Sequence, residues 1–118
     1  MSLYSEPLFF RHEFACRCGC GFDTVDAELL QVLLKAREDL NAPVYITSGC
    51  RCSHHNARVN GSPKSMHLLG RAGDINIRTY TPAQVHEYLC RIYPDKYGIG
   101  KYQNFTHIDT RSGPPARW

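Results

Sequence analysis

The sequence of 118 residues has no long apolar run and no strong excess of one charge. A membrane-spanning helix needs about 20 consecutive apolar residues, and no segment approaches that length, so we predict no membrane span. Lys and Arg total 14 and Asp and Glu total 11, which leaves a formal net charge of +3. This charge is small and dispersed, whereas nucleic-acid-binding proteins carry a basic patch or stripe. We therefore expect no nucleic-acid partner.

The pattern of a secretory signal, a basic start followed by about 7–15 apolar residues, is also missing. Glu6 and Pro7 interrupt the N-terminal segment, and the apolar run 8–10 is too short. We therefore expect synthesis without a signal peptide. Hydrophobic residues make up 42% and charged residues 21%, and there is no repeat or linker. These features are typical of one globular domain over residues 1–118, and we expect a monomer.

Cysteine, in contrast, is abundant, with six residues at Cys16, Cys18, Cys20, Cys50, Cys52 and Cys90. The first three alternate within residues 1–22, a Cys-rich segment without regular periodicity. Their C-x-C-x-C spacing differs from the C-x-x-C of zinc knuckles and redox motifs. Three hypotheses stay open for these cysteines: reduced thiols, a disulfide from the 16–20 segment to Cys50 or Cys52, and a zinc ion bound by thiolates, which would be separate from the metal site considered below.

Apolar periodicity predicts two main helices. One spans residues 24–40, with Asp23 or Thr24 as its N-cap; its apolar stripe consists of Leu29, Leu33, Ala36 and Leu40. The other spans residues 81–93, where Thr81 is the N-cap and Pro82 the first helical residue. A short helix is expected over residues 53–60.

Strands are predicted at residues 44–48 and 72–78 from their β-branched content and alternation. Residues 98–102 and 105–109 are expected to pair as a hairpin, and the tail 112–118 is expected to be non-regular. We therefore predict an α+β fold, with a small, mainly antiparallel sheet and flanking helices.

Three side chains in this scheme suggest a metal site. His67 ends a loop, Asp74 lies on the polar face of one strand, and His107 lies on the corresponding face of another. Catalytic zinc needs three nitrogen or oxygen ligands and an open fourth position. If the two strands are neighbours, these three side chains converge.

Two longer segments carry a family resemblance. Residues 46–56 and 61–75 contain S-G-C-R and S-M-H-L-L-G-R-A-G-D, and residues 105–109 contain H-x-D. With the opening F-A-C-R-C-G-C-G, they resemble the M15 metallopeptidases, of the M15A type, over about residues 10–118. That group comprises D-Ala-D-Ala carboxypeptidases, dipeptidases and peptidoglycan endopeptidases. The resemblance implies a hedgehog/D,D-peptidase-like fold.

The resemblance also implies roles for single residues. His67, Asp74 and His107 match the zinc ligands. Arg51 matches an arginine that contacts the substrate and stabilises the developing oxyanion; a structural ion pair with a carboxylate is the alternative. Ser65 matches a residue beside the substrate; the alternative is a loop hydroxyl that bonds the backbone.

Asp109 is a candidate catalytic residue that either orients His107 or remains a solvated strand-end carboxylate. Lys64 and Arg71 are expected to add positive charge for carboxylate substrates, or simply to be solvated.

This chain departs from the family pattern at the general base. Many relatives have Glu at the position of Asn104, and another branch has His at the position of Tyr102. Asn cannot accept a proton, and Tyr is a poor base at neutral pH. The candidate replacements are Asp109, His54 and His55. Cys50 also replaces the usual aromatic residue before Arg51.

The main hypothesis is therefore a zinc (Zn²⁺) peptidase that hydrolyses peptidoglycan stem peptides or cross-links with zinc-activated water. It would act on the bacterial cell wall, and a phage gene is one source that we consider. The second is a catalytically weak or inactive zinc domain that binds wall peptide in a phage tail or lysis protein. The third is a module organised by a cysteine-bound zinc.

Overall fold

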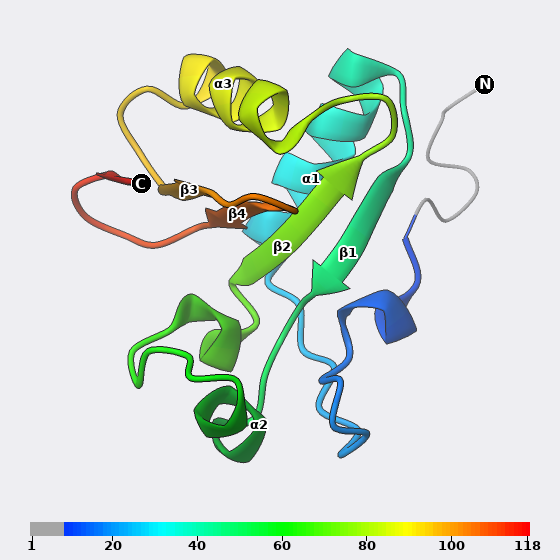
Figure 1. The fold of residues 1–118 in the computed structure, drawn as a ribbon, viewed down its shortest axis with the longest axis vertical. Helices are drawn as coiled ribbons and strands as arrows, with labels where there is room; N and C mark the ends of the chain where they lie inside the picture. Colours follow the sequence, from blue (N-terminus) through cyan, green and yellow to red (C-terminus); the bar gives the residue numbers. More distant parts are fainter. Residues whose placement is uncertain (1–8) are drawn as a thin grey trace.

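The structure is a computed structural model that describes residues 9–118, and it has an α+β architecture (Figure 1). A single mixed sheet is flanked by helices, as the sequence predicts. Its helices are η1 (Arg11–Phe14), α1 (Ala27–Leu40), α2 (Ser53–Arg58), η2 (Met66–Leu69) and α3 (Pro82–Ile92). Its strands are β1 (Val44–Ser48), β2 (Ala72–Ile77), β3 (Gly98–Lys101), β4 (Thr106–Asp109) and β5 (Ala116–Arg117).

The strands lie in the order β1-β2-β4-β3-β5. The pairs β1–β2, β2–β4 and β3–β4 are antiparallel, so the predicted hairpin and the mainly antiparallel sheet are confirmed. The prediction of a non-regular tail is wrong, because β5 adds to β3 as a short parallel strand. Backbone hydrogen bonds from Trp118 N–H to Ile99 O and from Lys101 N–H to Trp118 O extend this pairing to residue 118.

The helices begin where polar side chains satisfy their free N–H groups. Thr81 caps α3, with Pro82 as the first helical residue, as predicted. Helix α1 begins later than predicted: Asp26, rather than Asp23 or Thr24, is the N-cap and accepts a hydrogen bond from Leu29 N–H. Helix α2 ends at Arg58, two residues before the predicted end.

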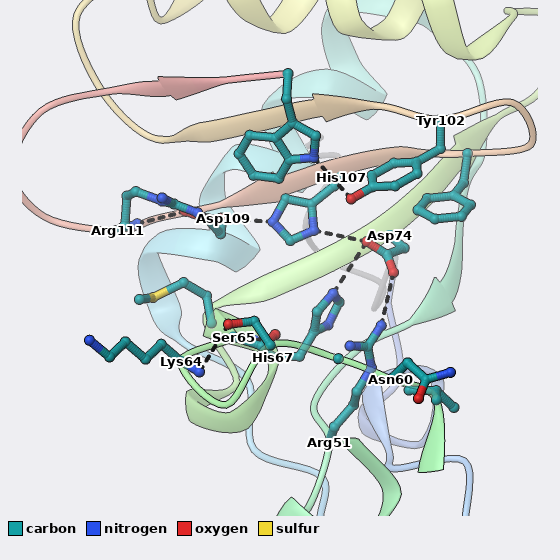
Figure 2. Close-up of a pocket in the computed structure, with 16 residues that line it drawn as sticks. Arg51, Asn60, Lys64, Ser65, His67, Asp74, Tyr102, His107, Asp109 and Arg111 are labelled. Atoms are coloured by element: carbon teal, nitrogen blue, oxygen red, sulfur yellow. Dashed lines mark hydrogen bonds and ion pairs between the residues drawn. The ribbon is translucent and has the colours of Figure 1, made fainter. Parts of the chain in front are cut away.

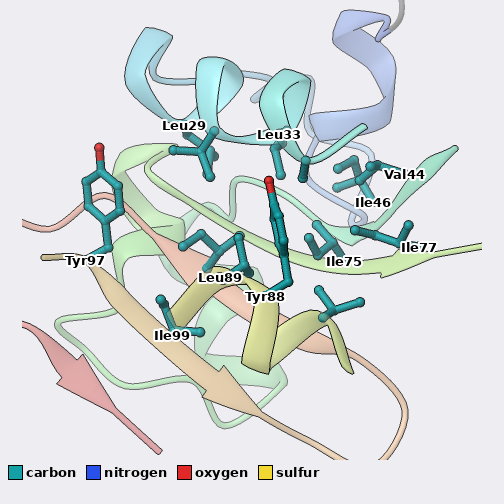
Figure 3. Close-up of a cluster of buried hydrophobic side chains, with 14 of the residues drawn as sticks. Leu29, Leu33, Val44, Ile46, Ile75, Ile77, Tyr88, Leu89, Tyr97 and Ile99 are labelled. Carbon is teal, nitrogen blue, oxygen red and sulfur yellow. The ribbon is translucent and has the colours of Figure 1, made fainter. Parts of the chain in front are cut away.

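The hydrophobic core lies between the sheet and the helices α1 and α3 (Figure 3). Leu29 and Leu33 of α1 and Leu89 of α3 are buried against Ile75 and Ile99 of the sheet. Because side chains alternate along a strand, the residues next to these core positions point to the opposite face. That opposite face carries Asp74 of β2 and His107 and Asp109 of β4. Within residues 9–118, no helix is long and apolar enough to cross a membrane.

Candidate metal centre and cleft

Three buried polar side chains converge on the polar face of the sheet (Figure 2). His67 comes from η2, Asp74 from β2 and His107 from β4. The sheet register sets Asp74 directly opposite His107 across the β2–β4 pair. One potential ligand atom from each residue lies within 4.8 Å of the others. Asp74 Oδ1 is 3.2 Å from His67 Nε2 and 2.9 Å from His107 Nδ1.

His67 is held with a defined ring orientation. Its backbone N–H bonds Ser65 Oγ, the N-cap of η2, at 3.1 Å. Its ring Nδ1 lies 2.5 Å from Gly49 O. Because a carbonyl oxygen only accepts, Nδ1 carries the proton and Nε2 of the neutral ring has a lone pair. That lone pair faces the Asp74 carboxylate, an arrangement that requires a proton or a cation between the two atoms.

His107 lies between two carboxylates. Its Nε2 is 2.7 Å from Asp109 Oδ2, and its Nδ1 faces Asp74. Asp109 is fully buried and is fixed by Arg111, whose Nε and Nη2 each donate to it at 2.8 Å. Asp109 therefore orients the ring so that Nδ1 faces Asp74 and could bind a metal ion, as carboxylates that bond metal-binding histidines commonly do.

Without a metal ion, the charges of this cluster shift proton affinities in opposite directions. Burial alone would raise the pKa of Asp74, but hydrogen bonds from His107 and His67 lower it to about 2. Burial alone would lower the pKa of His107, but its bonds to Asp109 and Asp74 raise it. Both shifts favour a positive charge between Asp74 and Asp109, and a metal ion at His107 Nδ1 would supply that charge in place of a proton.

The donor set fits a divalent metal ion. Two imidazole nitrogens and one carboxylate oxygen are the ligand types of catalytic zinc sites, and His67 Nε2 and His107 Nδ1 both face Asp74 Oδ1. Imidazole also suits other transition metals. The arrangement therefore predicts a transition-metal site, as the sequence does.

Arg51 lies at the edge of this cluster. Its Nη2 is 3.3 Å from Asp74 Oδ2, its Nη1 donates to Asn56 Oδ1 at 3.2 Å, and its Nε donates to Ser48 Oγ at 3.3 Å. Arg51 therefore makes a structural ion pair with a carboxylate, which was the alternative to its role in substrate binding. The guanidinium nevertheless lines the same cavity as the cluster, so the pairing with Asp74 also positions it there.

A cleft of about 500 Å³ opens over the cluster. It is lined by Arg51, Val59, Asn60, Gly61, Ser62, Lys64, Ser65, Met66, His67, Asp74, Tyr102, Phe105, His107, Asp109, Arg111 and Trp118. Ser65 thus both lines the cleft and bonds the backbone, so the two alternatives for this residue coexist. Lys64 lines the cleft, whereas Arg71 does not and instead bonds Thr110 O.

The far wall of the cleft is made by the C-terminal strand. Trp118 lies with its ring 5.2 Å from that of His107, and its Nε1 donates to Tyr102 Oη at 2.9 Å. A β-carbon at Gly100 would lie 2.3 Å from Trp118 Nε1, so glycine leaves the space that the indole fills. Neither Trp118 nor Arg111 was among the predicted site residues. The place of Trp118 depends on the pairing of β5 with β3, and Arg111 is held in the cleft by its bonds to Asp109.

Two of the three candidates for a general base, His54 and His55, do not line the cleft. Asn104, at the position where many relatives have Glu, does not line it either. Among the described residues that do line it, the carboxylates are Asp74 and Asp109. Asp109 accepts hydrogen bonds on both oxygens, so its placement favours orientation of His107 over proton transfer.

The family model described as Peptidase M15 matches residues 7–109, most of the chain. The chain belongs to the peptidase M15 family. Members of this family are metal-dependent peptidases, and the His67, Asp74 and His107 cluster gives this M15 peptidase a matching candidate site. None of the curated proteins compared with the chain matches it.

Proposed function

We propose that this M15 peptidase is a zinc-dependent hydrolase of peptide bonds in peptidoglycan stem peptides or cross-links, and that it acts on the bacterial cell wall. The single observation that carries the proposal is that His67, Asp74 and His107 converge at the base of a cleft with cationic walls.

His67 Nε2, Asp74 Oδ1 and His107 Nδ1 would hold the ion, because these atoms already face one another. When bound, zinc supplies Lewis acidity that polarises the scissile carbonyl and lowers the pKa of a water molecule to about 7, so that no strong base is needed. This suits a cleft whose described residues offer no unengaged carboxylate.

Arg51 would stabilise the charge that develops on the carbonyl oxygen. Its side chain is fixed by Asp74, Asn56 and Ser48, so little reorganisation is needed when the charge forms. The Tyr102 hydroxyl accepts from Trp118 and keeps its own proton free to donate to a bound peptide. Asp109 acts as a positioning residue for His107.

The charge of the cleft supports an acidic peptide as substrate. Arg51, Lys64 and Arg111 line it and exceed in charge the carboxylates of Asp74 and Asp109, with which Arg51 and Arg111 pair. Figure 2 shows Lys64 and Arg111 on the opposite side of His67 from Arg51. Peptidoglycan stem peptides carry free carboxylates that these cations would attract. Cleavage of the peptide bond next to a terminal carboxylate would make the enzyme a carboxypeptidase, and cleavage of an internal peptide bond would make it an endopeptidase.

The test is digestion of purified muropeptides, monomeric and cross-linked, with product masses read by mass spectrometry. We expect hydrolysis that a chelator abolishes and added zinc restores. Arg51→Ala should lower kcat/KM about 10²–10³-fold, the effect of removing one oxyanion donor. Arg91→Ala, which alters an exposed arginine of α3 paired with Glu87, is the matched control and should leave kcat/KM unchanged.

A second candidate function is a zinc-containing domain that binds wall peptide without cleaving it. The observation that favours it is the lack of an unengaged carboxylate base among the described residues of the cleft. Zinc-dependent binding of muropeptides with no product masses from any wall type would support it and would exclude the hydrolase.

A further inference from the structure

A second group of potential metal ligands lies outside the cleft, in the Cys-rich segment. Cys16, Cys18 and Cys20 come from the loop after η1, and Cys52 comes from the start of α2. Their four Sγ atoms all lie within 4.8 Å of one another. Residues far apart in the sequence thus bring four thiols to one point.

The sulfur separations match a metal site rather than a disulfide. Sγ of Cys16 lies 3.5 Å from that of Cys18 and 3.8 Å from that of Cys52, and Cys18 and Cys52 are 3.7 Å apart. Zinc–sulfur bonds of about 2.3 Å in a tetrahedron place sulfurs about 3.8 Å apart. A disulfide requires about 2.05 Å. All six cysteines are free, so the structure does not contain the disulfide considered from the sequence.

Backbone donors already point at two of these sulfurs. The N–H of Cys52 donates to Cys16 Sγ, and the N–H of His55 donates to Cys52 Sγ, each at 3.4 Å. Such bonds stabilise negative charge on sulfur, as thiolate ligands require. Gly19, with φ +82°, permits the turn between Cys18 and Cys20 that brings both toward Cys16.

The other two cysteines do not belong to this cluster. Cys50 Sγ lies 3.2 Å from Phe14 O and 2.9 Å from Phe22 O, two carbonyl oxygens that only accept, so its thiol is a buried, protonated packing group. Cys90 lies on α3 beside His86. Four cysteines remain, which is the number that closes a structural zinc site.

We propose that Cys16, Cys18, Cys20 and Cys52 bind one structural zinc ion as thiolates, separate from the His67, Asp74 and His107 site. Its role is to tie the irregular loop at residues 16–20 to the start of α2. Binding releases the thiol protons to solvent and needs no redox step. Because Cys52 follows Arg51 directly, this ion would also hold the backbone from which the Arg51 side chain enters the cleft.

The first test is metal counting by mass spectrometry on protein purified under reducing conditions and saturated with zinc. We expect two zinc ions per chain in the wild type and one in Cys18→Ser, a substitution at an exposed side chain. Cys90→Ser, the matched control outside the cluster, should keep two. The double variant His67→Ala/His107→Ala should keep one.

The second test uses cobalt(II) in the double histidine variant, where only the cysteine site remains. Tetrahedral thiolate coordination gives an intense sulfur-to-cobalt charge-transfer band, and we expect this band to appear there and to be lost when Cys18→Ser is added. The measurement does not depend on catalysis, so it stands whether or not the cleft hydrolyses peptides.

Three outcomes would overturn the proposal. The first is equal zinc content in wild type and Cys18→Ser, and the second is a cobalt complex of the double histidine variant without the charge-transfer band. The third is a folded, metal-free protein in which a disulfide between Cys16 and Cys52 persists after treatment with a reductant. If Cys18→Ser does not fold, the cobalt spectrum of the double histidine variant decides. If instead the proposed hydrolase is wrong, the wild type would lack the zinc ion bound by His67 and His107, or would bind it without hydrolysing muropeptides. The cysteine-bound zinc would be unaffected in either case.

Discussion

Replacing Asp109 with Asn probes how the protein prepares His107 for a metal ion. In the native chain, Asp109 Oδ2 accepts from His107 Nε2 at 2.7 Å and from Arg111 Nη2 at 2.8 Å. Oδ1 accepts from Arg111 Nε and from the N–H groups of Gly98 and Arg111. The substitution Asp109→Asn keeps the shape of the side chain but removes the charge and converts one oxygen into a donor.

The size of the effect follows from these contacts. An amide nitrogen in place of Oδ2 would donate to His107 Nε2, where the carboxylate accepts. His107 Nε2 would then have to accept, and the ring proton would lie on Nδ1, the atom that faces Asp74. Loss of such an orienting carboxylate costs about 10–100-fold in metal affinity, which corresponds to about 1.4–2.8 kcal/mol. Removing one partner of a buried ion pair also destabilises the fold by about 3–5 kcal/mol, and we expect the lower end because Arg111 is partly exposed.

The assay is zinc affinity measured by competition with a chelator of known affinity, under conditions where circular dichroism shows the variant to be folded. Asp95→Asn is the matched control, because Asp95 is an exposed carboxylate outside the cleft. Its zinc affinity should equal that of the wild type. A folded Asp109→Asn variant with unchanged affinity would refute the inference that Asp109 sets the tautomer of His107.

Further perturbations test other parts of the site and core. Gly100→Ala should displace Trp118, the one tryptophan of the sequence, from its place beside His107. The tryptophan fluorescence emission should then shift to longer wavelength. An unchanged emission spectrum would contradict the close packing of Gly100 against Trp118. In the metal-free protein, the pKa of His107 is higher in the folded state than in the unfolded state. The contribution of His107 to the free energy of unfolding is therefore complete below the unfolded pKa of about 6.5. It is lost as the pH rises through the pKa of the folded state. Urea unfolding should show this loss, and saturating zinc should remove it. Leu33→Ala should lower the free energy of unfolding by about 2–5 kcal/mol, because Leu33 is fully buried between α1 and the sheet.

Local sequence was enough to predict the main elements, but not every boundary. Thr81 and Pro82 form a start signal that depends only on neighbouring residues, and α3 begins there. Near α1, Asp23, Thr24 and Asp26 are all good caps. The choice among them is tertiary, because the N–H of Asp26 bonds Gly70 O on the segment after η2.

The short strand β5 was not predictable from the tail sequence. Its two residues follow consecutive prolines, which indicate irregular structure. The strand exists because Ala116 N–H bonds Tyr97 O and the Arg117 guanidinium bonds Tyr97 O as well. These partners lie about 20 residues earlier in the chain, so no local pattern reveals them.

The candidate site shows a similar division between chemistry and position. The residue types of His67, Asp74 and His107 indicated a metal site, and the predicted strands made their meeting plausible. Their geometry depends on the β2–β4 register, which pairs residues 33 positions apart. His54 and His55 are chemically suitable bases, but they do not line the cleft. Their position relative to the cleft also depends on tertiary contacts that the local sequence does not reveal.

The segment of residues 49–52 connects both candidate metal sites. The carbonyl of Gly49 orients the His67 ring, and the Cys50 thiol holds the N-terminal loop through Phe14 O. Arg51 bonds Asp74 with its side chain and His67 O with its backbone N–H, while Cys52 joins the thiol cluster. Glycine is required at residue 49, since a β-carbon would lie 2.6 Å from Phe14 O. A shift of this segment would therefore move a histidine ligand, the proposed oxyanion donor and a cysteine ligand together, so an ion at the cysteine site would also stabilise the geometry of the cleft.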